Sequence, residues 1–221
     1  GSTRAGIAIS KAAADTLKRV SLELGGKGAN IIFEDADPKA AAQGAIRCFR
    51  NSGQSCNAPT RMLVHKSRYD EAVASASEVA TNTHVGPASE EGKHIGPVVS
   101  EAQFNKIQGL IEVGMSEARL TAGGLGRPDG LNRGYYVKPT VFADVNNTMT
   151  IAREEVFGPV LSIIPFETEE EAIAIANDTP YGLTNYIQTS DVETRRRVAR
   201  AFASLRGKKL VNPWKKHDNI P

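Results

Sequence analysis

The chain has 221 residues, of which 40% are hydrophobic and 24% charged, a globular composition large enough for one large domain or two small ones. Lysine and arginine total 27 against 25 aspartates and glutamates, a balance that excludes the strong field needed to recruit nucleic acid or an anionic membrane. No apolar run approaches the roughly 20 residues that cross a bilayer, and the N-terminus lacks the pattern of a secretory signal. We therefore expect a cytoplasmic protein without nucleic-acid or membrane partners.

Only two cysteines occur in the sequence, Cys48 and Cys56, and they lie close together across the end of a predicted helix. Two such cysteines are a poor basis for a disulfide framework and too few for a thiolate metal site, so no bound metal is expected. Cys48 falls in the helical pattern beside Ile46 and Phe49. We assign it to packing.

The chain opens with a glycine-bearing turn at residues 1–6, which leads into a helix predicted over residues 7–19. Such a turn can bind phosphate, because free N–H groups at a helix N-terminus and the helix dipole both favour an anion. Glycine turns that start helices are common, however, and the first two residues also match a scar left by an expression tag. Strands are predicted next over residues 20–24 and 30–33, joined by a Gly-Gly turn.

Cys56 lies in a small polar loop between a helix predicted over residues 37–50 and a strand predicted over residues 60–65. A thiol is a nucleophile only as thiolate, which requires partial exposure, and a loop provides it. The alternative is that Cys56 is a small buried hydrophobe, as most free cysteines are. Glu23, at a predicted strand end beside two glycines, is the candidate general base, and a solvated surface charge is the alternative for it.

Strands and helices alternate along the remainder of the chain. Helices are predicted over residues 67–83, 101–118, 167–177 and 192–205, and strands over residues 135–145, 161–166, 185–189 and 210–212. Asp37 and Ser100 are the expected N-caps of two helices. This order predicts an α/β fold with a mainly parallel sheet flanked by helices.

Four motifs stand in a fixed order: GSTRAG at residues 1–6, ELGGK at residues 23–27, GQSC at residues 53–56 and EEVFGPV at residues 154–160. Each is a modest signal alone, but in this order and at these separations they resemble the aldehyde dehydrogenase superfamily, over residues 1 to about 198. The resemblance implies three regions. They are the end of the dinucleotide-binding domain (residues 1–25), the catalytic domain (residues 26–206) and a divergent tail (residues 207–221).

The resemblance implies that Cys56 attacks an aldehyde carbonyl to form a thiohemiacetal, which loses hydride and becomes a thioester. Glu23 would activate the water that hydrolyses this thioester, and its presence favours the hydrolytic subclass over the CoA-acylating one. The main-chain N–H of Cys56 would donate to the developing oxyanion. The substrate is thus a small-molecule aldehyde.

The implied cofactor is NAD or NADP. By the resemblance, Gly1, Ser2 and Gly6 lie at the cofactor with Leu24, and Ser2 contacts the pyrophosphate. Glu155 binds the ribose beside the nicotinamide, and Phe157 lines the nicotinamide side of the pocket. The superfamily's cofactor domain begins before residue 1, so we expect a truncated enzyme that can associate into a homo-oligomer. The alternative is a catalytically silent remnant that acts as a folded or interaction module.

Overall fold

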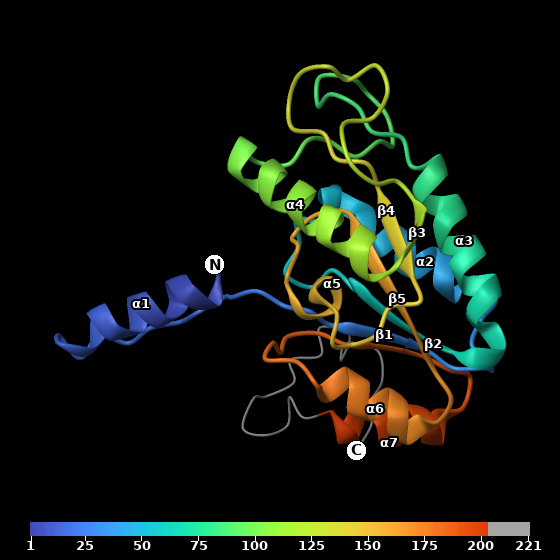
Figure 1. The fold of residues 1–221 in the computed structure, drawn as a ribbon. Coiled ribbons are helices and arrows are strands. Elements are labelled where there is room, and N and C mark those ends of the chain that lie inside the picture. Colours follow the sequence, from blue (N-terminus) through green and yellow to red (C-terminus); the bar gives the residue numbers. More distant parts are fainter. Residues whose placement is uncertain (203–221) are drawn as a thin grey trace.

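A single six-stranded sheet organises the computed structural model, which describes residues 1–202. The strands are β1 Ala29–Ile32, β2 Arg61–His65, β3 Arg119–Ala122, β4 Thr140–Ala143, β5 Val160–Phe166 and β6 Tyr186–Gln188. They lie in the order β3-β4-β5-β2-β1-β6, and all neighbours are parallel except β3 and β4. The predicted α/β class with a mainly parallel sheet is confirmed (Figure 1).

Helices cover both faces of the sheet, because its four central strands, β4, β5, β2 and β1, are mostly apolar and almost fully buried. On one face α2 (Ala40–Phe49) and α3 (Tyr69–Asn82) pack in a core with Ile32, Met62 and Ile163. The other face is covered by α4, α5, α6 and α7, whose bounds are Glu101–Glu117, Thr150–Arg153, Glu169–Asn177 and Val192–Ala201. Two 3₁₀ helices, Arg50–Gly53 and Lys66–Arg68, precede β2 and α3.

Residues 1–24 form an arm that projects from this body (Figure 1). Helix α1 (Thr3–Ala14) runs outward from its N-cap, Ser2, and the chain then returns beside it, where Gly6 packs against Leu24. Two predictions were wrong here. The helix begins at Thr3 rather than at residue 7, so residues 3–6 form its first turn and not a glycine turn before it. It ends at Ala14 rather than at residue 19, because the chain turns through Leu17 with a positive φ of 54°. Residues 20–24 are not a strand, since no neighbouring strand among residues 1–202 hydrogen-bonds to them.

Most other predicted elements are confirmed within a few residues of their ends. The helix predicted from residue 37 begins at Ala40 with Lys39 at its N-cap, so the prediction of Asp37 as the N-cap was wrong. Asp37 instead closes the preceding turn by accepting a hydrogen bond from the main-chain nitrogen of Lys39 at 2.7 Å. The strand predicted over residues 135–145 shrinks to β4, since Pro139 just before it has no N–H for a ladder. Strand β3 was missed, because its four residues show no buried alternation.

The helix predicted over residues 192–205 ends earlier, at Ala201, because Phe202 takes an extended conformation. The strand predicted at residues 210–212 and the tail at residues 207–221 lie outside the described residues. Within residues 1–202, no helix combines the length and the hydropathy that a membrane crossing requires.

Candidate active site

Three of the sequence motifs lie at one edge of the sheet, because each directly precedes one of three adjacent parallel strands. Residues 23–27 lead into β1, residues 53–56 into β2 and residues 154–160 into β5. Parallel strands begin at the same edge, and β2 lies between β5 and β1. The Cys56 loop is therefore flanked on each side by another motif.

The loop that carries Cys56 turns sharply after α2. Asn51, Ser52 and Gly53 all have positive φ angles, of 52°, 55° and 70°. Such a left-handed run is unusual for residues with a side chain, and it directs the chain away from the helix. A turn closed by a hydrogen bond from the Ala58 nitrogen to the Ser55 carbonyl, at 3.1 Å, then presents Cys56 at the surface.

Side chains of the loop fix it to the segment that precedes α4. Ser52 Oγ donates to the Gly96 carbonyl at 2.5 Å, and Gln54 Oε1 accepts from the Val99 nitrogen at 2.9 Å. These bonds tie the backbone around the cysteine to a second loop 40 or more positions away. The thiol thus stands on a loop that is both exposed and held in place.

The two cysteines lie in opposite environments, as the sequence predicted. Cys56 is exposed, whereas Cys48 is buried inside α2 with its thiol directed at the Val160 carbonyl, 3.6 Å away. Burial raises the pKa of the Cys48 thiol to about 12. Only Cys56 is therefore positioned to act as a nucleophile at neutral pH.

Glycines allow the three motifs to approach closely. A Cβ placed on Gly26 would overlap the Cys56 carbonyl oxygen, and one on Gly53 would overlap the carbonyl of Gly158. A Cβ on Gly25 would overlap the carboxylate of Glu155. Main chain and carboxylate occupy the space that any larger residue would fill, so these glycines are required by packing.

Glu155 lies directly against the glycine pair. Its Oε1 accepts a hydrogen bond from the Gly26 nitrogen at 2.9 Å, and its carbonyl accepts one from Lys106 Nζ at 2.8 Å. Helix α4 also binds the two residues after Glu155. Gln103 Nε2 donates hydrogen bonds to the carbonyls of Val156 and Phe157, at 3.0 and 2.9 Å. Sequence reasoning missed Gln103 and Lys106, whose positions on the helix carry no distinguishing pattern.

Glu23 lies on the arm, where its main chain is hydrogen-bonded and its side chain faces solvent. Its carbonyl accepts a hydrogen bond from the amino group of Gly1 at 2.8 Å. Its side chain is exposed and forms no hydrogen bond or ion pair within residues 1–202. The chain links it to the site through Gly26, three positions on, which touches the Cys56 carbonyl. The pairing of Glu23 with Cys56 stays a prediction.

The predicted phosphate turn has the donors that a phosphate needs. Ser2 Oγ accepts from the Ala5 nitrogen at 3.2 Å and caps α1, while the main-chain nitrogens of Thr3 and Arg4 have no acceptor within residues 1–202. Free N–H groups and the dipole of this 12-residue helix favour an anion. These N–H donors suit a phosphate, and the Glu155 carboxylate can accept hydrogen bonds from ribose hydroxyls, so the groups present fit part of a dinucleotide.

Two buried cations lie behind the site and were not predicted. Arg61, on β2, is fully buried and donates to the Lys27 carbonyl at 3.1 Å. The Lys27 side chain is also buried, and its Nζ has no hydrogen-bond partner within residues 1–202. Burial lowers the pKa of Lys27 to about 7 and that of Arg61 to about 10. The signal available in the sequence was an arginine that starts an apolar strand and a lysine that ends a glycine motif.

The structure thus places an exposed cysteine between a Gly-Gly motif and a glutamate turn, at one edge of an α/β sheet. The sequence profile of the aldehyde dehydrogenase family matches residues 1–219, and the chain belongs to this family. The family that the motifs resembled is thus confirmed.

Individual relatives agree with this assignment. The 3-succinoylsemialdehyde-pyridine dehydrogenase of a Pseudomonas species is 52% identical over 202 residues. That alignment covers 90% of this chain and 42% of the relative. The crystal structure of an aldehyde dehydrogenase from Bartonella henselae matches with a TM-score of 0.90 and 62% identity, over 91% of this chain and 42% of that one.

A third relative was solved with ligands. A mutant of aldehyde dehydrogenase C from Pseudomonas syringae, in complex with NAD⁺ and octanal, matches with a TM-score of 0.89 and 48% identity, over 91% of this chain and 42% of that one. Other aldehyde dehydrogenases that match are NAD⁺ complexes as well. This chain therefore spans less than half the length of the relatives it matches.

Proposed function

We propose that this chain carries the nucleophile and part of the cofactor site of an NAD-dependent enzyme that oxidises an aldehyde to a carboxylic acid. The observation that carries the proposal is the position of Cys56, exposed at the sheet edge between the glycine pair and the Glu155 turn. Membership of the aldehyde dehydrogenase family supports it. The division of the chain at residue 25 belongs to the same proposal.

Cys56 acts as the nucleophile in this proposal. Its thiolate adds to the carbonyl carbon, a C–S bond forms, and the carbonyl electron pair moves to oxygen. The Cys56 N–H donates to that oxygen. Bound NAD⁺ would supply the hydride acceptor at this point, and loss of hydride from the adduct carbon would leave a thioester on Cys56.

Glu23 completes the turnover as general base. Its carboxylate takes a proton from water, the resulting hydroxyl adds to the thioester carbon, and the Cys56 thiolate leaves with the C–S electron pair. The Glu23 side chain is exposed and has no partner among residues 1–202, which leaves it free to take this position. The products are a carboxylic acid and regenerated enzyme.

The cofactor residues act by binding. The N-terminus of α1, with Gly1, Ser2 and Gly6 in its first turns, holds phosphate through free N–H groups. The second carboxylate oxygen of Glu155 accepts a ribose hydroxyl, and Phe157 covers the nicotinamide side. Leu24 supports the helix by packing against Gly6.

The test is turnover with NAD⁺ and a panel of aliphatic and aromatic aldehydes, followed by the absorbance of the reduced cofactor. The proposal would be supported if the wild-type chain turns over, the Cys56→Ser variant does not, and the Cys48→Ser variant does. No turnover at high enzyme concentration would contradict it for this chain and favour the silent folded module. NADP⁺ in the same assay decides between the two cofactors.

Two further expectations belong to this proposal. Self-association into a homo-oligomer is favoured by the apolar side chains that the arm exposes, Ile7, Ile9 and Leu17. Sedimentation velocity over a range of concentrations tests it. A cytoplasmic location is expected from the family and is tested by fractionation of the source cells.

A further inference from the structure

The guanidinium of Arg61 forms an unusually complete set of hydrogen bonds for a buried group. Besides the Lys27 carbonyl at 3.1 Å, it donates to Asn147 Oδ1 at 2.7 Å and to the carbonyls of Ile175 and Ala176 at 3.0 and 3.1 Å. The last two lie at the C-terminal end of α6, whose dipole favours a cation. Arg61 therefore joins the motif before β1 to α6 and to the loop before α5.

Asn147 continues the chain of contacts to the surface. Its Nδ2 donates to the carbonyl and to Oδ2 of Asp178, at 2.9 and 2.8 Å. The same two oxygens accept from Arg153 Nη1, at 3.0 and 2.8 Å. Asn147 thus links two guanidinium groups, one buried on β2 and one half exposed at the end of α5.

The contacts close into a ring. Arg153 is two positions before Glu155 and Lys27 directly follows Gly26, while Gly26 donates to Glu155 at 2.9 Å. The two motifs that flank Cys56 are thus joined twice. They meet directly at the site, and they are joined again behind it through Arg61, Asn147, Asp178 and Arg153.

A buried guanidinium is costly to desolvate, and an apolar residue on β2 would fill the same core position at lower cost. What an apolar residue cannot do is hold a carbonyl of the glycine motif and the end of α6 at once. We propose that Arg61, Asn147, Asp178 and Arg153 are positioning residues that keep the carboxylate of Glu155 seated on Gly25 and Gly26 beside Cys56. This inference rests on the proposed function for its effect on catalysis.

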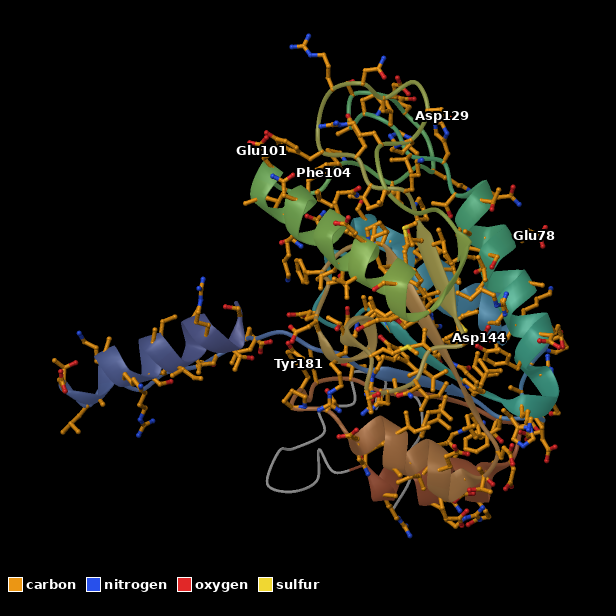
Figure 2. The ribbon with its side chains drawn as sticks, in the orientation of Figure 1. Glu78, Glu101, Phe104, Asp129, Asp144 and Tyr181 are labelled. Atoms are coloured by element: carbon orange, nitrogen blue, oxygen red, sulfur yellow. The ribbon has the colours of Figure 1, made fainter. Side chains whose placement is uncertain are left out.

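The outermost link of the ring can be cut without disturbing the core. Arg153→Met removes one surface ion pair, at 2.8 Å, and Arg119→Met removes a matched one, between Arg119 and Asp144 at 2.6 Å. Asp144 directly follows β4, which runs parallel to β5, so it lies at the opposite end of the strands from the three motifs; Figure 2 shows it across the body from the base of the arm. Arg119→Met is therefore a control for loss of an ion pair remote from the site.

The first readout needs no activity and is the hydrogen exchange of the Gly26 amide, whose acceptor is Glu155. We expect about tenfold faster exchange in Arg153→Met and in Asn147→Ala, as for a weakened hydrogen bond to a charged group, and an unchanged rate in Arg119→Met. Glu155→Ala, which deletes the acceptor, sets the upper limit. Equal exchange in wild type and both ring variants would overturn the inference, as would equal acceleration in Arg119→Met.

The second readout is kinetic. Arg153→Met should raise the KM for NAD⁺ about tenfold with little change in kcat, because a displaced carboxylate weakens uniform binding of the cofactor. A fall in kcat alone would contradict a role through Glu155. If the wild-type chain shows no turnover, the proposed function fails, while the exchange experiment still decides whether the ring positions Glu155.

Discussion

The main-chain nitrogen of Gly26 donates to the carboxylate of Glu155 at 2.9 Å and joins two positions 129 residues apart. On its other side Gly26 lies against the carbonyl oxygen of Cys56, where a Cβ would overlap that oxygen. The glycine therefore separates the candidate nucleophile from the candidate ribose-binding carboxylate by the width of one main chain.

Gly26→Ala should push the Cys56 loop out of place. Overpacking of this kind costs about 1–3 kcal/mol, and we expect a loss of that size in the free energy of unfolding, together with loss of any turnover. Urea denaturation measures the first and the aldehyde assay the second. Gly96→Ala is the matched control, because a Cβ on Gly96 meets nothing within 4 Å. Equal stability of the two variants would show that the loop tolerates the methyl group.

Thiol labelling should separate the two cysteines. In the native protein an alkylating reagent at neutral pH should modify Cys56 and spare Cys48, which is buried and whose pKa is raised to about 12 by burial. We expect one label per native chain and two after unfolding, counted by intact mass. Cys56→Ser should then take up almost no label while folded. Faster labelling of Cys48 than of Cys56 would contradict the assignment of the nucleophile.

The buried amine of Lys27 should make stability depend on pH. Its pKa is about 7 in the folded protein and 10.5 when unfolded, so the unfolded chain binds more protons between these values. The free energy of unfolding therefore rises with pH between about 7 and 10.5, and it is lost progressively as pH falls from 10.5 to 7. Below pH 7 the amine is protonated in both states and contributes no further change. From pH 7 to pH 9 we expect a gain of roughly 2 kcal/mol in the free energy of unfolding.

Urea denaturation at these two pH values tests the prediction. Above pH 9 the Cys48 thiol lowers the free energy of unfolding as pH rises, because burial raises its pKa from 9.0 to about 12. The comparison is therefore made between pH 7 and pH 9. Lys27→Met should remove this dependence of the free energy of unfolding on pH. Lys66→Met is the control, because Lys66 is exposed and its hydrogen bond to Glu167 raises its pKa rather than lowering it. A flat wild-type profile would show that the amine is not held in an apolar environment.

Asp35 should stabilise the turn between β6 and α7. Its carboxylate accepts hydrogen bonds from Thr189 Oγ1 at 2.8 Å, Ser190 Oγ at 2.6 Å and the Asp191 nitrogen at 3.0 Å. Asp35→Ala should lower the free energy of unfolding by about 1–2 kcal/mol. Asp37→Ala, which removes one hydrogen bond from the Lys39 nitrogen, should cost less. Chemical denaturation of the pair provides the comparison.

The contribution of the Asp35 carboxylate to stability should depend on pH in the acid range. Desolvation raises the pKa of Asp35, but the hydrogen bonds from Ser190 and Thr189 lower it by a larger amount. The net pKa therefore lies below its ordinary value of 3.8. Its contribution is therefore present above pH 3.8 and is lost as pH falls through the folded-state value. The difference in the free energy of unfolding between wild type and Asp35→Ala should shrink on acidification. A difference that stays constant with pH would contradict a lowered pKa of Asp35.

Local signals in the sequence predicted most of the secondary structure. Ser100 was expected as an N-cap, and its Oγ accepts from the Gln103 nitrogen at 3.2 Å. The apolar period placed α4, and the apolar run 161–166 placed β5, because both signals act within a few residues. The same reasoning failed for residues 20–24, which have a strand pattern but no neighbouring strand within the described residues.

The sequence by itself determined the fold class and the family and predicted that Cys56 lies in a loop, because turns, periodicity and motif order are properties of neighbouring residues. Only the tertiary structure decided which groups surround Cys56. The sheet order places β2 between β5 and β1, and parallel strands begin at one edge, so motifs far apart in sequence meet there. The seat of Glu155 on Gly26 and the burial of Arg61 follow from that order, which no local pattern encodes.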